Sequence, residues 1–200
     1  MDVKGITSNS TVKDYLEAQE EFLEKHPAPC FTCSDNCCER DWNIELDIVF
    51  FNRLVNENAN GDNKDNCFFK MLDQYVTVNQ VNGPVFKHTP CQFLNEDGLC
   101  SIYDRRTFIC RGYTCHQEKE RYKVLRGLIG HALNLTLLIK IKQKQNHDSL
   151  KNVSPNFEID RPGQLPLAAT DYEINIFTLI ESVKSTINDY EYEIFCSIFE

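Results

Sequence analysis

The sequence predicts a helix-rich α+β fold, a single domain over residues 1–200 with small β-hairpins and an irregular cysteine-cluster core. Three observations support this prediction. Apolar residues recur three or four positions apart on both sides of a cysteine-rich region, the dipeptide Asn82-Gly83 is a strong hairpin signal, and most cysteines fall in two short windows. We expect residues 25–116 to form the cysteine-cluster core and residues 117–200 to form a C-terminal helical part.

Helices are predicted where the apolar period is clear and a capping residue precedes it. The expected segments are 12–25 after Thr11, 48–58 after Asp47, a long helix from Thr114 or Cys115 to about residue 145, and a last helix through residues 174–187 after the capping-box sequence Thr170–Glu173. The expected buried face of the long helix consists of Tyr122, Leu125, Ile129, Leu133 and Leu137. Gly127 and Gly130 in its middle are expected either to interrupt a straight rod or to allow close packing of another backbone segment.

Strands are predicted in shorter pieces. Residues 42–46 are expected to form one short strand, and residues 74–79 and 84–89 a hairpin about Asn82-Gly83. Residues 91–94 and 99–103 are expected to form a second hairpin, which would hold Cys91 and Cys100 side by side. The remaining polar stretches are expected to be a loop at 56–66 and a linker at 145–168.

Eight of the ten cysteines lie in two short windows, a density that packing does not explain. The C-x2-C spacing of Cys30 and Cys33 suits a tetrahedral metal site, because the tight turn between them aims both sulfurs at one point. Neighbouring side chains of an extended segment point to opposite sides. Cys37 and Cys38 therefore either face two sites or leave one thiol spare.

Composition narrows the possible functions. The net charge of −9, from 21 basic and 30 acidic residues, argues against general nucleic-acid binding. The first residues contain no apolar segment typical of a secretory signal, and the longest apolar stretch, residues 124–141, contains Arg126, His131, Asn134 and Lys140, which would be costly in a membrane. We therefore expect a cytoplasmic protein, in which thiols stay reduced and available for metal binding or redox chemistry.

The cysteines lie in four segments with a recognisable pattern: Cys30-x2-Cys33-x3-Cys37-Cys38, Pro90-Cys91-x-Phe93-Leu94, Gly98-x-Cys100-Ser101-Ile102-Tyr103 and Arg106-x3-Cys110-Arg111-x-Tyr113. Over about residues 25–116 this pattern resembles that of the YkgJ-like cysteine-cluster (CxxCxxCC) family, whose members are described as zinc- or iron-chelating proteins. The chain departs from the family pattern at Thr107, where the family usually has proline. As metal ligands the resemblance implies Cys30, Cys33, Cys37, Cys38, Cys91, Cys100, Cys110 and Cys115.

These thiolates suit either zinc or an iron–sulfur cluster, and the ligand type does not choose between the two. They could form two four-cysteine sites, or one such site with the other thiols left for different roles. Four thiolates on one divalent ion carry excess negative charge, which Arg105, Arg106 and Arg111 are placed to offset. His116, beside Cys115, is an alternative ligand.

The expected function is that of a metal-binding protein whose partner is the metal ion or cluster, with no nucleic acid and no membrane involved. One alternative is an iron–sulfur-dependent enzyme. It would be an oxidoreductase or, by analogy with flagellin lysine methylases that carry a related cysteine signature, a protein lysine methylase. The chain has no recognisable glycine motif for S-adenosylmethionine. A third hypothesis is a thiol redox sensor in which Cys37 and Cys38 form the reactive pair.

Overall fold

The computed structural model describes residues 5–26, 38–39, 43–59, 61, 63–79, 83–88, 90–113, 118–145 and 162–199. Seven α-helices and one two-stranded antiparallel sheet lie within these residues, which confirms the predicted helix-rich α+β class. In chain order the elements are α1 (Val12–Lys25), α2 (Ile48–Asn58), α3 (Lys64–Tyr75), β1 (Val76–Asn79), β2 (Gly83–Phe86), the 3-10 helix η2 (Tyr103–Arg105), α4 (Phe108–Gly112), α5 (Glu120–Gln145), η4 (Pro162–Gln164), α6 (Ile176–Glu181), η5 (Lys184–Thr186) and α7 (Asp189–Ile198).

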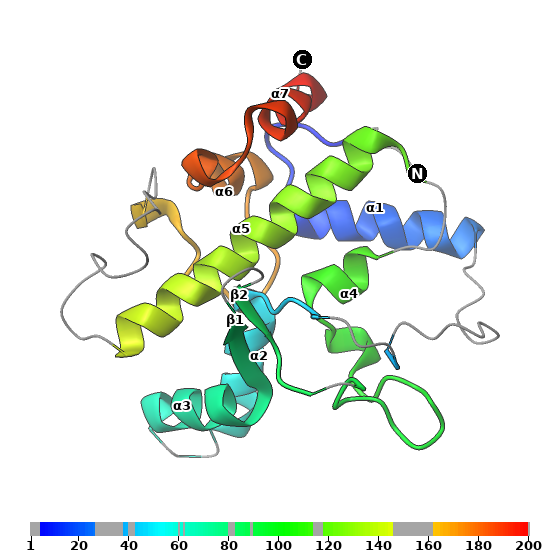
Figure 1. Cartoon of the computed structure of the whole chain (residues 1–200). Coiled ribbons are helices and arrows are strands. Elements are labelled where there is room, and N and C mark those ends of the chain that lie inside the picture. The colour runs from blue at the N-terminus through cyan, green and yellow to red at the C-terminus, as the bar shows by residue number, and fades with distance from the viewer. Residues whose placement is uncertain are drawn as a thin grey trace.

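Helix α5 is the central element of the fold and runs through the middle of the molecule (Figure 1). It packs against α2, α4, α6, α7 and β2. All five residues of its predicted inner face are buried, and so are residues on its other sides, among them Leu128, Leu135 and Ile139. Burial on all sides is the expected property of a helix that other elements enclose.

The same helix is long and apolar enough, by length and composition, to cross a membrane, and no other helix among the described residues is. Of its most apolar window, 67% is buried inside the structure, and the core helix of a soluble protein passes the same test. Its polar residue Asn134 donates a hydrogen bond to the carbonyl of Leu46, which precedes α2. Lys140 donates to the side-chain oxygen of Asn52 in α2. The apolar composition of α5 is thus accounted for by its central place.

The first two helices begin where their caps predicted. Thr11 caps α1 and forms a capping box with Asp14, and Asp47 caps α2 by accepting a hydrogen bond from the Phe50 amide at 2.8 Å. The predicted start of the long helix is wrong, because residues 118 and 119 are not helical and α5 begins at Glu120. Residues 114–117 lie outside the described residues.

The sequence did not predict α4, the short helix that carries Cys110. A methyl group added at Gly130 of α5 would lie 3.7 Å from the ring of Phe108, so α4 rests directly on this glycine. The expectation that Gly127 and Gly130 interrupt the long helix is wrong, since α5 is continuous from Glu120 to Gln145. One of these glycines instead allows a close approach of another helix.

The predicted hairpin is present but shorter. Strand β1 begins at Val76, because the first two residues of the predicted strand, 74 and 75, are the last residues of helix α3. Asn79 pairs with Gly83, which makes Gly83, with a φ of 65°, the first residue of β2 and not the second residue of a two-residue turn. Residues 80–82 lie outside the described residues.

Two other predictions along this part of the chain need correction. In the described part of residues 42–46, the expected strand is reduced to a single bridge between Glu45 and Val85. The expected polar loop at 56–66 ends early, because the Asn63 side chain accepts a hydrogen bond from the Asp65 amide at 2.8 Å and caps α3.

The C-terminal helical segment is divided differently from the prediction. Thr170 does not start a helix; Asn175 caps α6 and Asn188 caps α7. The residues before α6 are extended because they pair with the beginning of α1, where the Val12 amide donates to the Ile174 carbonyl at 2.8 Å. A local capping-box sequence has here been overridden by a backbone pairing between distant segments.

Part of the predicted linker also packs against the body of the fold. Leu165 is buried, and the side-chain amide of Asn52 donates to the carbonyls of Leu167 and Ala169 at 3.2 and 2.6 Å. Residues 146–161 of that linker lie outside the described residues.

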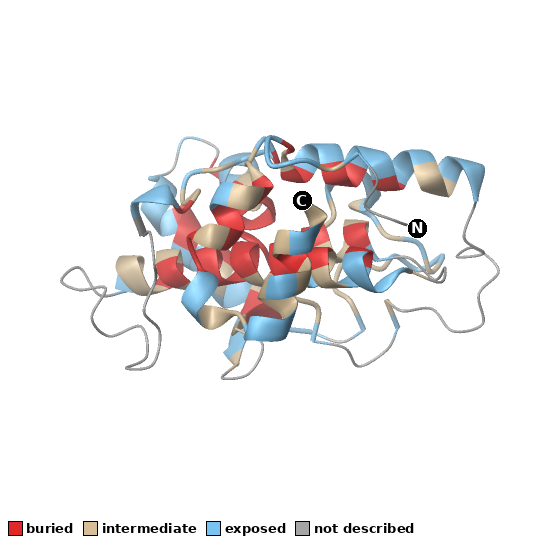
Figure 2. Ribbon diagram, turned by 90° about the horizontal axis from the view of Figure 1, so that it is seen from above, coloured by how far each residue is buried: buried red, intermediate tan, exposed pale blue. Residues whose placement is uncertain are grey.

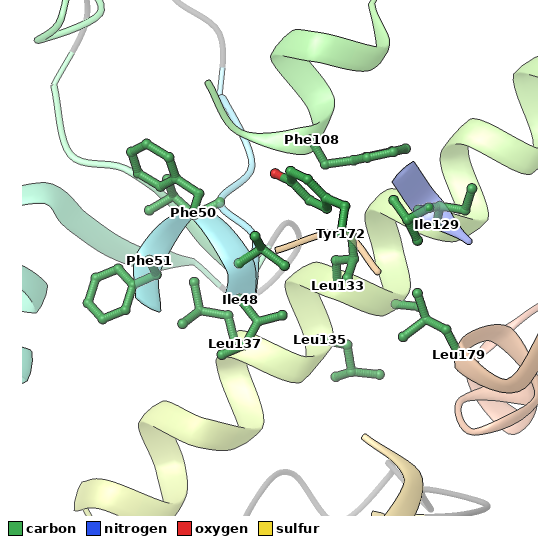
Figure 3. Close-up of a cluster of buried hydrophobic side chains, with 14 of the residues drawn as sticks. Ile48, Phe50, Phe51, Phe108, Ile129, Leu133, Leu135, Leu137, Tyr172 and Leu179 are labelled. Atoms are coloured by element: carbon green, nitrogen blue, oxygen red, sulfur yellow. The ribbon is translucent and has the colours of Figure 1, made fainter. Parts of the chain in front are cut away.

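The buried residues form one core between the helices (Figure 2). Figure 3 shows that this core joins residues far apart in the sequence, from Phe51 of α2 and Phe108 of α4 to Tyr172 and Leu179, around Leu133 of α5. Most of it is aliphatic and aromatic. The described cysteine segments contribute to this core through Phe108, and Cys91, Phe93 and Ile102 pack against it.

Candidate metal site

Four of the eight predicted ligands are described by the structure. They are Cys38, Cys91, Cys100 and Cys110, and all four are partly buried. The other four, Cys30, Cys33, Cys37 and Cys115, lie outside the described residues, as does the alternative ligand His116. The predicted ligand set can therefore be followed only in part.

Backbone hydrogen bonds bring the two cysteine windows together. The Cys91 amide donates to the Cys38 carbonyl at 2.9 Å, although the two residues are more than fifty positions apart. The Leu94 amide donates back to the Cys91 carbonyl at 2.9 Å, and Leu94 pairs with Cys100 in an antiparallel bridge. Hydrogen bonds thus join the backbone of Cys38 to that of Cys91, and the turn after Cys91 pairs with Cys100. The backbone segments of these three predicted ligands are therefore neighbours.

The predicted second hairpin is a turn with one bridge and not a pair of full strands. Asn95 closes it: its side-chain oxygen accepts hydrogen bonds from the amides of Asp97 and Leu99 at 3.1 and 2.8 Å. Gly98 adopts a φ of 74°, in the left-handed region that favours glycine. This local chemistry, visible in the sequence, positions Cys100 opposite the turn that contains Cys91.

Cys110 lies on α4, and Thr107 begins this helix. The Thr107 hydroxyl oxygen accepts a hydrogen bond from the Cys110 amide at 3.4 Å, and Thr107 is buried, with 1% of its surface exposed. The departure from the family pattern at this position therefore supplies a helix cap. The segment is held by that cap where the family usually has a proline ring.

The environment of Cys110 raises the pKa of its thiol to about 11. Burial is the largest cause, and Cys91 and Cys100 act in the same direction, whereas the Thr107 hydroxyl and the charge of Arg106 act in the opposite direction. The influence of Cys91 and Cys100 agrees with a location of the three cysteines in one region of the molecule.

Of the three arginines expected to offset thiolate charge, Arg106 is the one that acts on Cys110. Its guanidinium lies 3.7 Å from the centre of the Tyr103 ring and donates to the Cys110 carbonyl at 3.4 Å. Arg105 and Arg111 instead form ion pairs, each at 2.5 Å, with Glu57 of α2 and Glu20 of α1 respectively. Carboxylates on neighbouring helices thus bind these two arginines, and their role toward the thiolates stays a prediction.

Helix α4 is anchored to the core at both ends. At its beginning, the Asp47 carboxylate accepts a hydrogen bond from the Phe108 amide at 2.6 Å. At its end, the side-chain amide of Gln19 in α1 donates to the Arg111 carbonyl at 2.8 Å. The sequence indicated Asp47 only as the cap of α2, and it gave no signal for Gln19 beyond a polar residue on a helix.

Gln92 stands out among the residues beside the cysteines. Neither Oε1 nor Nε2 of its side chain has a hydrogen-bond partner in the described part of the chain, although both atoms are buried. Such groups are rare in folded proteins and call for an explanation. Sequence reasoning did not single out Gln92.

Two further cysteines and two histidines have other roles in the structure. Cys67 is 4% exposed and its thiol donates to the Val55 carbonyl at 3.3 Å, as expected for a small buried side chain. Cys196 lies on α7 and packs against the core. His26 ends α1 and stacks on Phe22, whereas His131 bonds to Thr186 at 2.8 Å.

No group of three or more His, Cys, Asp or Glu side chains that could hold a metal ion occurs among the described residues. Cys91, Cys100 and Cys110 share a region but do not by themselves form such a group. The chemistry of the donors nonetheless fits the metals that the sequence suggested, because thiolates are preferred ligands of zinc and of iron–sulfur clusters. The side-chain amide of Gln92 is buried and has no hydrogen-bond partner among the described residues, which is consistent with a further polar group bound in this region.

Together, these features define a helix-rich α+β protein in which separate segments bring cysteines to one region beside an apolar core. Residues 29–126 match the model of the CxxCxxCC family, whose description is "Putative zinc- or iron-chelating domain". This match confirms the resemblance seen in the sequence. A search of curated proteins and a search of solved structures each found no match.

Proposed function

We propose that this protein chelates zinc or iron through a cysteine site centred on Cys91, Cys100 and Cys110. Membership of a zinc- or iron-chelating family supports metal binding in general. Cys38 lies beside Cys91 through their backbone hydrogen bond, and it would join the first window to the second. In this proposal the ligand set is completed from Cys30, Cys33, Cys37 and Cys115.

The observation that carries the proposal is the backbone bonding that joins the segments of Cys38, Cys91 and Cys100. A cysteine thiol is mostly protonated at neutral pH, so a metal must displace its proton in order to bind. Arg106 and Thr107 favour the thiolate over the thiol and would assist this displacement. Such a site needs reduced thiols, which agrees with the proposed cytoplasmic location.

Zinc would organise the cysteine segments as a closed structural site, whereas an iron–sulfur cluster would add electron transfer. The residues that would hold either group are the same. The choice is therefore a matter for measurement on the purified protein.

The test is purification without oxygen, followed by measurement of zinc, iron and acid-labile sulfide together with the visible absorption spectrum. Zinc in stoichiometric amount without colour would identify a structural site. Iron with sulfide and a brown colour would identify a cluster. A reduced protein that binds neither metal would contradict the proposal.

Cysteine variants sharpen this experiment. Cys110→Ser should lose most of the bound metal, because it removes one of the three thiols at the centre of the proposed site. Cys67→Ser is the matched control, since Cys67 is buried away from the cysteine segments, and its metal content should equal that of the wild type. Equal metal content in both variants would remove Cys110 from the ligand set.

A further inference from the structure

Gln92 occupies a fixed place beside a predicted ligand. It follows Cys91 in a turn that the hydrogen bond from the Leu94 amide to the Cys91 carbonyl closes at 2.9 Å. On its other side, the ring of Phe93 packs against Phe50, Tyr75 and Phe86. The backbone of Gln92 is therefore held between a cysteine and an aromatic cluster.

The side-chain amide of Gln92 is buried at a cost in free energy. It has two N–H donors and one carbonyl acceptor, and the described part of the chain offers a partner to none of them. A leucine or methionine would fill the same space without this cost. A hydrogen-bond partner that comes with the bound metal would explain why an amide occupies the position.

The charge around the cysteines indicates what that partner is. Thiolates on a metal carry excess negative charge; Arg106 donates a hydrogen bond to the Cys110 carbonyl at 3.4 Å, whereas Arg105 and Arg111 are paired with carboxylates. Metal-bound sulfur accepts hydrogen bonds from N–H groups, and such donors tune metal affinity and reduction potential. A neutral amide supplies donors without adding a buried charge that would itself need a partner.

We infer that Gln92 is a positioning residue of the metal site, whose amide N–H groups donate to metal-bound thiolate sulfur when the site is loaded. This inference rests on the proposed function, because it needs a metal held by the cysteines. It assigns a role to a residue that lies between motif positions and is not itself a predicted ligand.

The test compares Gln92→Met with the wild type under reducing conditions. Methionine has a similar volume and no N–H donor, so zinc affinity, measured by competition with a chromophoric chelator, should fall about 10-fold or more. The thiolate-to-cobalt charge-transfer band of the Co²⁺-loaded protein should shift as well. The melting temperature of the metal-free protein should stay unchanged or rise, because an unpaired amide has been removed.

Two further variants test whether the effect comes from the lost N–H donors of Gln92. Gln92→Glu keeps the shape, lacks the donors and adds negative charge, so it should weaken zinc binding more than Gln92→Met. It also serves if the methionine variant does not fold. Gln74→Met is the matched control, because Gln74 is exposed on α3, donates to the Tyr75 hydroxyl at 3.0 Å and should leave zinc affinity unchanged.

Unchanged zinc affinity and an unchanged cobalt spectrum in Gln92→Met would overturn the inference. So would a loss of affinity matched by an equal loss of stability in the metal-free protein, which would give Gln92 a merely structural role. A wild-type protein that binds neither Zn²⁺ nor Co²⁺ would contradict the proposed function itself. The two failures are therefore distinguishable.

Discussion

Asp47 connects two helices through one buried carboxylate. Oδ1 accepts a hydrogen bond from the Phe50 amide in α2, and Oδ2 accepts from the Phe108 amide in α4 at 2.6 Å and from the Tyr172 hydroxyl at 3.1 Å. Burial raises the pKa of Asp47, while these hydrogen bonds lower it. The three donors replace the water that the carboxylate loses on folding.

Replacement of Asp47 by alanine should destabilise the protein by about 3 kcal/mol. The change removes the cap of α2 and leaves the amide of Phe108 and the hydroxyl of Tyr172 buried without a partner. The free energy of unfolding from urea titration measures this loss. Metal binding should weaken too, because the beginning of α4 is no longer held.

Tyr172→Phe is the control for Asp47→Ala. It removes one of the three donors and leaves both helix starts bonded to Asp47, so we expect a loss of only about 1 kcal/mol. If the two variants lost the same stability, the hydrogen bonds of Asp47 to the helix starts would contribute little.

The sequence predicted that Asp47 caps α2 but not that it also binds the beginning of α4. A cap acts over three residues, so the bond to Phe50 follows from local spacing. The bond to Phe108 spans 61 positions and depends on how α4 lies on α5. For the same reason the sequence indicated Thr107 as a departure from a motif, without showing that it caps a helix.

Between elements, Asn134 of α5 holds the hairpin and the segment before α2. Its side-chain amide donates to the carbonyls of Leu46 and Pro84, both at 2.8 Å. Gly83 approaches the same side chain so closely that a Cβ there would lie 2.5 Å from the Asn134 oxygen. Asn134, a polar residue in the middle of an apolar helix, thus links α5 to strand β2 by hydrogen bonding.

Asn134→Leu should destabilise the protein by about 2 kcal/mol, because the variant loses both hydrogen bonds and leaves buried carbonyls with fewer donors. Thr136→Val on the same helix is the matched control. The Thr136 hydroxyl donates only to the Ala132 carbonyl within α5, and we expect a change of about 0.5 kcal/mol or less. Urea titration monitored by circular dichroism compares the two, and a similar loss in both would contradict the role of Asn134.

Helix prediction was accurate where a cap and an apolar period agreed, as in α1, and it failed where another element decided the outcome. The residues before α6 carry a capping-box sequence but pair with the start of α1. Helix α4 has five residues, too few for a readable period, and it is held by its contacts with Asp47 and Gly130. Tertiary contacts outweigh local propensity in such short segments.

For the whole molecule, the apolar core extends far beyond the cysteine region, although Phe108 beside Cys110 belongs to it. The core cluster of buried residues includes Cys67, whereas Cys91 packs only at its edge. Small zinc-binding domains unfold without metal because they lack such a core. This protein has an extensive core around α5, so its helices should remain folded when the metal is removed.

Removal of metal by a chelator under reducing conditions should therefore leave most of the far-ultraviolet helical signal and a cooperative thermal transition, at a lower melting temperature. Leu133→Ala is the comparison. Leu133 is fully buried beside Phe108 and Tyr172, and its loss should cost about 3 kcal/mol with or without metal. Complete unfolding on chelation would contradict this expectation.

The sequence by itself determined the fold class, the starts of α1 and α2, the inner face of α5 and the resemblance to the family, because these depend on local spacing and on short motifs. The tertiary structure decided which residues meet: Arg106 donates to the Cys110 carbonyl, Arg105 and Arg111 pair with Glu57 and Glu20, and the backbone of Cys91 bonds to Cys38. Periodicity and caps act over a few residues, whereas these contacts join segments that only the packing around α5 brings together.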